Sequence, residues 1–223
     1  MQIHSKAILI YPDDASIAFL QPIADKIAAR FPNIDLFRPN HEGFYLTIDD
    51  EHEVVFYLGH GNNAFLFSSH LGSEGGKNSL SVNHAGRLFS DTSVVLLSCD
   101  SLSFIKNIGI LNLKSFFGFG DMPTDMDHVR NLRSGKPDYL DGITDEHLDF
   151  YRGTLVDSFL MGLNWLEDPS DLRPMFLGMK YVINKAIGKV LTESLWDNQI
   201  RTHMVGLLHE LKVEIGYSRV PSQ

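Results

Sequence analysis

Two short apolar runs constrain the fold of this chain more than any other feature. They are Val54–Leu58 and Val94–Leu97, and each is followed at once by small and polar residues. Continuous apolar runs of this length, bounded by turn residues, are typical of strands that are buried on both faces of a parallel sheet. The two runs therefore predict an α/β protein in which helices cover both faces of the sheet.

The residues that follow these runs carry the strongest functional signal. The first run leads into Gly59–Gly61, which contains His60, and the second leads into Ser98–Ser101, which contains Cys99, the only cysteine. In an open parallel sheet, ligands bind beyond the carboxyl ends of the strands. If the two strands are neighbours, about 4.8 Å apart, an imidazole and a thiol emerge side by side at that edge.

Alternating strand and helix patterns extend over the first 122 residues. Further strands are expected at 7–11, 34–37 and 115–119, and helices at 16–31, 81–89 and 104–111. A polar, glycine-rich stretch, 62–78, is expected to form a loop or hairpin over the crevice. The alternation predicts a three-layer α/β sandwich with a mostly parallel sheet.

The composition changes after Pro123. Residues 123–145 contain many Asp, Gly and Pro residues with little periodicity, so they are expected to form an irregular loop segment. Apolar residues then recur at helical spacing as far as Gly216, which is expected to cap the last helix. The predicted organisation is a catalytic α/β core over 1–122, the loop segment, and a helical C-terminal region over 146–223 that packs on or beside the core.

Composition narrows the functional classes. The chain has 223 residues, of which 43% are hydrophobic and 21% charged, as in ordinary soluble globular proteins. A net charge of −9 without a basic stripe argues against a nucleic-acid partner. The apolar stretches fall short of the roughly 20 residues that span a bilayer, and the first residues do not resemble a signal peptide. A single cysteine suits a reducing, cytoplasmic setting.

His60 and Cys99 are suited to nucleophilic catalysis. A thiol with a pKa of about 8.5 is only slightly ionised at neutral pH and needs a base to become an efficient nucleophile. Histidine can take that proton and return it to a leaving amine. Gly61 lets backbone N–H groups approach a substrate closely, so together with the N–H of Cys99 it could form an oxyanion hole.

These residues resemble the motifs of a known family. Two hydrophobic blocks that end in His60-Gly61 and in Cys99-Asp100-Ser101 are similar to the dyad blocks of the caspase-like cysteine peptidases, closest to the bacterial CHAT-domain and metacaspase-like members. The resemblance covers roughly residues 6–122. It implies a caspase-like sheet and a thiol protease in which His60 is the base, Cys99 the nucleophile and Gly61 part of the oxyanion hole. The helical C-terminal third departs from the ordinary pattern of the family.

Acidic residues follow several of the predicted strands. Asp13 and Asp14 follow the first, Asp100 follows the strand that leads to Cys99, and Asp121 follows the strand at 115–119. The resemblance implies that these loops form the first substrate pocket, and no arginine occupies the strand ends. We therefore expect cleavage after Arg or Lys. The alternative for these aspartates is a structural role, since strand-end Asp residues commonly cap helices.

Other motifs do not indicate a cofactor or a metal. Residues 72–78 lack the spacing and the final hydroxyl residue of a phosphate loop, and the ten histidines lack the short spacings of a zinc site. Asp121, Asp125 and Asp127 lie in no regular calcium loop. The expected partners are a protein or peptide substrate and, through 62–78 or the helical tail, a regulatory protein. The alternative is a non-catalytic α/β binding module, either an inactive peptidase relative or a flavodoxin-like domain.

Overall fold

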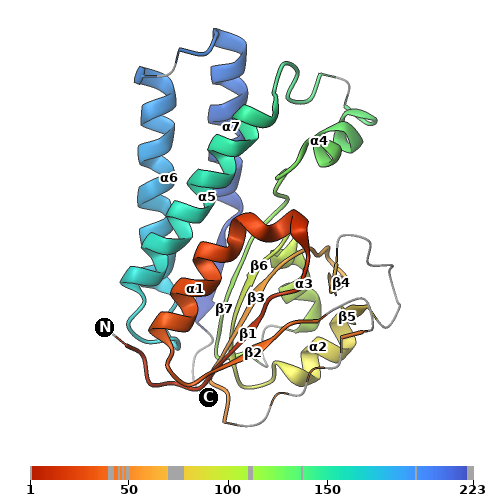
Figure 1. Ribbon diagram of the computed structural model, residues 1–223, viewed down its shortest axis with the longest axis vertical. Coiled ribbons are helices and arrows are strands. Elements are labelled where there is room, and N and C mark those ends of the chain that lie inside the picture. Colours follow the sequence, from red (N-terminus) through yellow and green to blue (C-terminus); the bar gives the residue numbers. More distant parts are fainter. Residues whose placement is uncertain are drawn as a thin grey trace.

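A six-stranded sheet runs through the centre of the molecule (Figure 1). The computed structural model describes residues 2–219 except 40–42, 45, 47, 49–50, 70–77, 110–112, 137 and 194. The strands of the sheet are β1 (Ala7–Ile10), β2 (Ile34–Phe37), β3 (Val54–Leu58), β6 (Ser93–Leu97), β7 (Ser115–Gly118) and β8 (Gly216–Arg219). Their order is β2-β1-β3-β6-β7-β8, with the first five parallel and β8 antiparallel to β7.

The five predicted strands are confirmed, and the two central ones are neighbours. β3 pairs with β6 in parallel, from Val54 opposite Ser93 to Leu58 opposite Leu97. Every residue of both strands is buried, as expected for apolar runs without alternation. The segments that carry His60 and Cys99 therefore leave the sheet at the same edge.

Each central strand contributes to two hydrophobic cores, because successive side chains of a strand point to opposite faces. In β3, Val54, Phe56 and Leu58 belong to one buried cluster, whereas Val55 and Tyr57 belong to the other. The sheet is therefore covered on both sides, and the predicted α/β class is confirmed.

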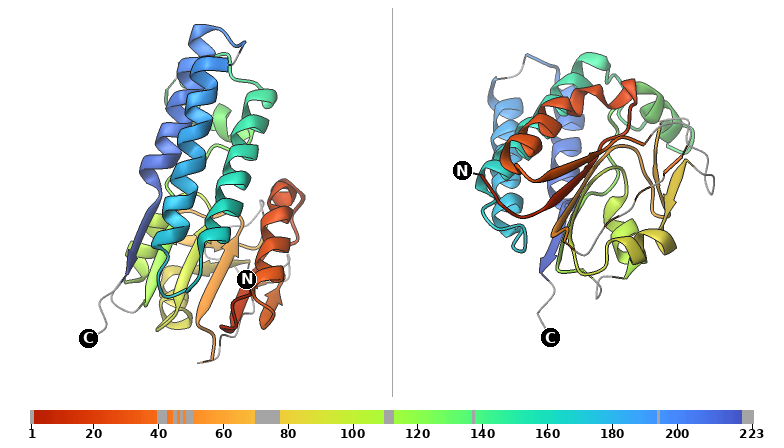
Figure 2. Two further views of the ribbon diagram at one scale, coloured as in Figure 1. Left: turned by 90° about the vertical axis from the view of Figure 1, so that its left-hand side faces the viewer. Right: turned by 60° about the horizontal axis from the view of Figure 1, so that its bottom comes forward.

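The helices divide between the two faces. The first face carries a 3-10 helix (Ala15–Leu20), α1 (Gln21–Arg30), α5 (Asp145–Trp165), α6 (Arg173–Glu193) and α7 (Asn198–Glu214), and the second carries α2 (Val82–Leu88) and α3 (Ser101–Ile108). Figure 2 shows α5, α6 and α7 side by side, reaching past the end of the sheet. No helix in the described part of the chain is both long enough and apolar enough to cross a membrane.

The C-terminal region differs from the prediction at its end. α7 ends at Glu214, and Gly216 begins β8 instead of capping a helix. A Cβ atom at Gly216 would lie 2.7 Å from the Leu102 side chain of α3, so glycine allows the strand to pass close to that helix. The chain after the helices therefore returns to the sheet as an edge strand, a pairing that helical periodicity gives no sign of.

The segment 123–145 was expected to be irregular throughout, and that prediction is wrong. It contains α4 (Met126–Arg133), whose N-cap residue Asp125 accepts a hydrogen bond from the His128 backbone N–H at 2.7 Å. Such a cap stabilises even a short helix, and the buried side chain of Val129 anchors it to the protein.

The stretch 62–78 contains one short strand and leads into another. β4 (Phe65–Phe67) pairs with β5 (Ser79–Ser81) in antiparallel fashion. The middle of this stretch, including the glycine-rich run tested as a phosphate loop, lies outside the described residues.

Candidate functional site

Cys99 lies at a turn that is fixed by hydrogen bonds between β6, α3 and the segment after β7. The Ser101 hydroxyl accepts a hydrogen bond from the Phe119 N–H at 2.9 Å, and the Asp100 N–H donates to the Gly120 carbonyl at 2.8 Å. Asp100 adopts the left-handed conformation with φ of 50°, which short polar residues tolerate best after glycine. The turn therefore places the thiol next to the chain that follows Gly120.

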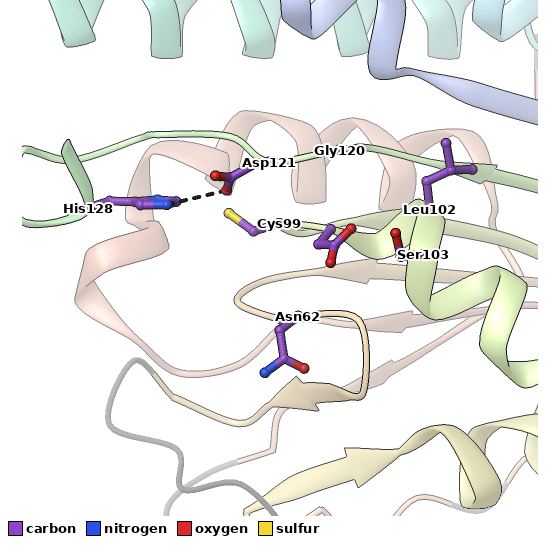
Figure 3. Close-up of a pocket in the computed structure, with 9 residues that line it drawn as sticks. Asn62, Cys99, Leu102, Ser103, Gly120, Asp121 and His128 are labelled. Atoms are coloured by element: carbon purple, nitrogen blue, oxygen red, sulfur yellow. Dashed lines mark ion pairs between the residues drawn. The ribbon is translucent and has the colours of Figure 1, made fainter. Parts of the chain in front are cut away.

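The thiol belongs to a cluster with Asp121 and His128. One ligand atom from each of the three residues lies within 4.8 Å of the other two. The His128 Nε2 atom is 3.3 Å from the Asp121 carboxylate, and Figure 3 shows the sulfur directed toward this pair. The Cys99 Sγ also donates to the Met122 carbonyl at 3.3 Å.

α4 brings His128 to the cluster. Asp121 lies three residues after the end of β7, and Asp125 starts α4 four residues later, so His128 falls in the first turn of the helix. His128 was missed by sequence reasoning, which assigned no helix here. The sequence does contain a signal, because an Asp after Pro123 that caps a helix predicts a side chain three residues on in the first turn.

The imidazole and the carboxylate stabilise each other's charged forms. Hydrogen bonding to Asp121 and, to a smaller extent, to Cys99 raises the pKa of His128 to about 10. The hydrogen bond from His128 in turn lowers the pKa of Asp121. At neutral pH the thiol thus has an imidazolium for a neighbour.

The cluster lines an open pocket of about 670 Å³. The pocket wall also includes Gly61, which was predicted as an oxyanion residue, and Asp100. A Cβ atom at Gly61 would lie 2.9 Å from the Ser98 Oγ, so glycine keeps this wall compact. Gly61 and Cys99, the two predicted oxyanion positions, therefore lie on one pocket.

His60 is held by a second set of contacts. Its Nε2 atom is 2.6 Å from the Ser16 Oγ and 3.9 Å from the Asp14 carboxylate, and Ser16 donates its hydroxyl proton to Asp14 at 2.7 Å. Because that proton goes to Asp14, Nε2 must carry the hydrogen shared with Ser16. In the neutral ring Nδ1 is then the acceptor nitrogen.

His60 and Cys99 both line a second, small cavity. This cavity of about 20 Å³ is lined by both residues together with Leu97 and Met122. The backbone at His60 is fixed because the buried Tyr57 hydroxyl donates to its carbonyl at 2.6 Å. Cys99 therefore lines one cavity with each histidine, the open pocket with His128 and the small cavity with His60.

The predicted acidic residues have different positions. Asp100 and Asp121 line the open pocket. Asp14 caps the first helical turn and bonds to Ser16, as the structural alternative expected, and Asp13 is solvent-exposed. Of the acids considered for calcium, Asp125 caps α4 and Asp127 forms an ion pair with Arg130.

A comparison of the chain with protein-family models, with curated proteins and with solved structures found no match. The geometry of the site is therefore the basis for assigning a function.

Proposed function

We propose that this protein is a cysteine hydrolase that cleaves peptide bonds, with Cys99 as the nucleophile. The observation that carries the proposal is the grouping of the Cys99 thiol, the His128 imidazole and the Asp121 carboxylate on the wall of an open pocket. A cysteine beside an imidazolium is one of the arrangements by which proteins activate a thiol for nucleophilic attack.

The two histidines have separate roles in this proposal. His128, paired with Asp121, stabilises the Cys99 thiolate from the pocket side. His60 uses its Nε2–H in the contact with Ser16, so it takes up and returns protons at Nδ1. This retains the His60–Cys99 dyad expected from the sequence and adds a second imidazole to it.

The reaction then follows the usual course of acyl transfer through a thioester. His60 first takes the proton of the Cys99 thiol at Nδ1, and the thiolate so formed makes a C–S bond to the scissile carbonyl carbon, while backbone N–H groups at Gly61 and Cys99 hold the oxyanion. When the C–N bond breaks, His60 gives a proton to the leaving amine. His60 next takes a proton from water, the water oxygen bonds to the acyl carbon, and the C–S bond breaks to restore the thiolate.

The substrate proposed is a peptide with Arg or Lys before the cleaved bond. Asp100 and Asp121 both line the pocket beside Cys99, and carboxylates favour basic side chains through charge-assisted hydrogen bonds. A fluorogenic panel tests this directly, with faster release from Arg-ended and Lys-ended peptides than from Asp-ended ones. Preferential cleavage of the Asp-ended peptides would overturn the specificity.

Labelling with an Arg-containing acyloxymethyl-ketone peptide tests the catalytic assignment. We expect stoichiometric labelling that Cys99→Ala abolishes and that His60→Ala slows by roughly 100-fold or more, the size expected for loss of a general base. His209→Ala is the matched control, because His209 is exposed on α7. Labelling of the His60→Ala protein at the rate of the control would show that His60 is not the base. Rapid, unselective alkylation without turnover would favour the alternative of a non-catalytic binding module.

The family assignment is part of the same proposal. Adjacent parallel strands that end in His60 and Cys99 support the resemblance to caspase-like peptidases. The proposal includes a reducing, cytoplasmic setting for the free thiol and a regulatory protein partner that acts through the region around 62–78 or the C-terminal helices.

A further inference from the structure

We propose that Cys99, Asp121 and His128 together form a binding site for Zn²⁺, with three protein ligands and a fourth position open to the pocket. The proposal concerns equilibrium metal binding and does not depend on peptide cleavage. Sequence reasoning predicted no metal, and the site is a new assignment made from the grouping of the three side chains.

The three donor atoms match zinc in chemical type. Cys99 offers sulfur, His128 nitrogen and Asp121 oxygen, the three kinds of ligand that Zn²⁺ accepts. Mg²⁺ and Ca²⁺ prefer sites made of oxygen atoms alone, so a site with a thiolate and an imidazole disfavours both. The ligand set therefore selects a borderline transition-metal ion over the hard cations.

The distances fit a tetrahedral ion after small side-chain rotations. Zinc-to-ligand bonds of 2.0–2.3 Å in a tetrahedron place neighbouring ligand atoms roughly 3.5 Å apart. His128 and Asp121 are already 3.3 Å apart, and all three ligand atoms lie within 4.8 Å of one another. The Asp121 carboxylate is half-exposed, so it is free of the close packing that would prevent its rotation toward an ion.

The surrounding contacts hold the ligands in place before an ion arrives. Asp125 fixes the start of α4 and hence the position of His128, while the Ser101 hydroxyl and the Asp100 N–H fix the turn at Cys99. Ligands that are positioned by neighbouring hydrogen bonds bind metals more tightly. The three ligands also come from two segments of the chain, so an ion would connect the end of β6 to α4.

The fourth coordination position faces solvent. The cluster lines the open pocket of about 670 Å³, which leaves room for a water molecule on the ion, as in zinc sites with three protein ligands. Since zinc occupies the Cys99 sulfur, the same thiolate cannot attack a peptide. A cysteine hydrolase at this site is therefore inhibited by zinc and restored by a chelator.

Zinc titration of the full-length protein against a chromophoric chelator tests the site. We expect one Zn²⁺ per chain, and a loss of affinity of about 100-fold or more in Cys99→Ala, Asp121→Asn and His128→Gln, since changes even to outer residues cost 10–100-fold. His209→Gln is the matched control. His60→Gln tests whether the other histidine near the thiol is a zinc ligand. Unchanged affinity in any of the three ligand variants, or an equal loss in His60→Gln or the control, would overturn the assignment.

Cobalt substitution provides a readout of the ligands themselves. Co²⁺ in the wild-type protein should give a thiolate-to-cobalt charge-transfer band and tetrahedral d–d absorption, and Cys99→Ala should lose the former. Circular dichroism of each variant checks that it is folded. A cobalt spectrum without thiolate charge transfer in the wild-type protein would contradict the site.

The two proposals fail in different ways. If the protein binds zinc tightly but a zinc-free sample does not cleave peptides, the metal site stands and the hydrolase proposal is wrong. Cleavage by the zinc-free protein that saturating zinc does not inhibit would leave the hydrolase and remove the metal site.

Discussion

The side chain of Ser16 connects His60 to Asp14, and this chain of hydrogen bonds determines which imidazole nitrogen carries a proton. The Ser16 hydroxyl contacts the His60 Nε2 at 2.6 Å and donates to Asp14 at 2.7 Å. A residue that orients a histidine acts on catalysis without touching the substrate. Removal of the Ser16 hydroxyl should therefore lower the turnover rate with little effect on the stability of the fold.

We expect Ser16→Ala to lower kcat for an Arg-ended peptide by roughly tenfold, the size of one lost hydrogen bond. KM should change little, and Ser16→Thr should restore most of the rate. Ser170→Ala is a matched control, because Ser170 also bonds through its N–H and hydroxyl to the aspartate two residues before it. The same loss in the control, or no loss in Ser16→Ala, would show that Ser16 does not position His60.

Gly61 is a residue at which an added methyl group has no space. The new Cβ would lie 2.9 Å from the Ser98 Oγ and 3.1 Å from the Phe65 carbonyl. We expect Gly61→Ala to lower the free energy of unfolding in urea by about 1–3 kcal/mol, as is usual for overpacking. Gly188→Ala is the control, because a Cβ atom in that part of α6 meets nothing within 4 Å. A Gly61→Ala protein as stable as wild type would contradict the contact.

At the scale of elements, α4 positions the histidine on the pocket side of the thiol. The helix is short, and its start depends on the Asp125 carboxylate, which accepts from the His128 N–H at 2.7 Å. An isolated helix of this length is unstable by itself. Mutation of the Asp125 cap should therefore displace His128 without changing any residue of the Cys99–Asp121–His128 cluster.

We expect Asp125→Ala to cost about 1 kcal/mol through loss of the cap and to slow alkylation of Cys99 by iodoacetamide, because His128 is no longer fixed beside the thiol. Asp125→Asn keeps a capping oxygen and should behave as wild type. Asp197→Ala is the comparison, since Asp197 caps α7 by accepting from the Ile200 N–H. It should lower stability while leaving alkylation unchanged, and a slowing equal to that of Asp125→Ala would argue against a local effect.

At the scale of the whole molecule, the C-terminal helices and the sheet share one hydrophobic core. Phe117 of β7 and Phe119, directly after that strand, lie in the same buried cluster as Leu155 and Phe159 of α5. Phe119 and Phe159 stack at a centroid distance of 6.4 Å. Because this core is shared, the helical region should not unfold separately from the sheet.

We therefore expect urea unfolding in a single transition. The fluorescence of Trp165 and Trp196 reports on the helical region, and far-UV circular dichroism reports on the whole chain, so the two curves should coincide. Gly162→Val should shift both midpoints together, because a Cβ atom at Gly162 would lie 2.9 Å from Met175 on α6. Two separate transitions would indicate that the helical region is an independent domain.

The sequence by itself determined the five parallel strands and the edge of the sheet at which Cys99 lies. Local information is enough here, since Val54–Leu58 and Ser93–Leu97 are buried on both faces and every residue in them must be apolar or small. It also indicated Gly61, Asp100 and Asp121, because each lies three residues after the end of a strand. These residues lie on one pocket for the same reason.

Only the tertiary structure decided which groups surround the thiol. His128 reaches Cys99 because a capped helix turns back after β7, and β8 joins the sheet because the chain returns after α7. Neither event leaves a periodic pattern, since both depend on contacts between residues far apart along the chain. Distances between side chains of separate segments are set by packing, which is why a histidine that strand order did not suggest lies beside the thiol.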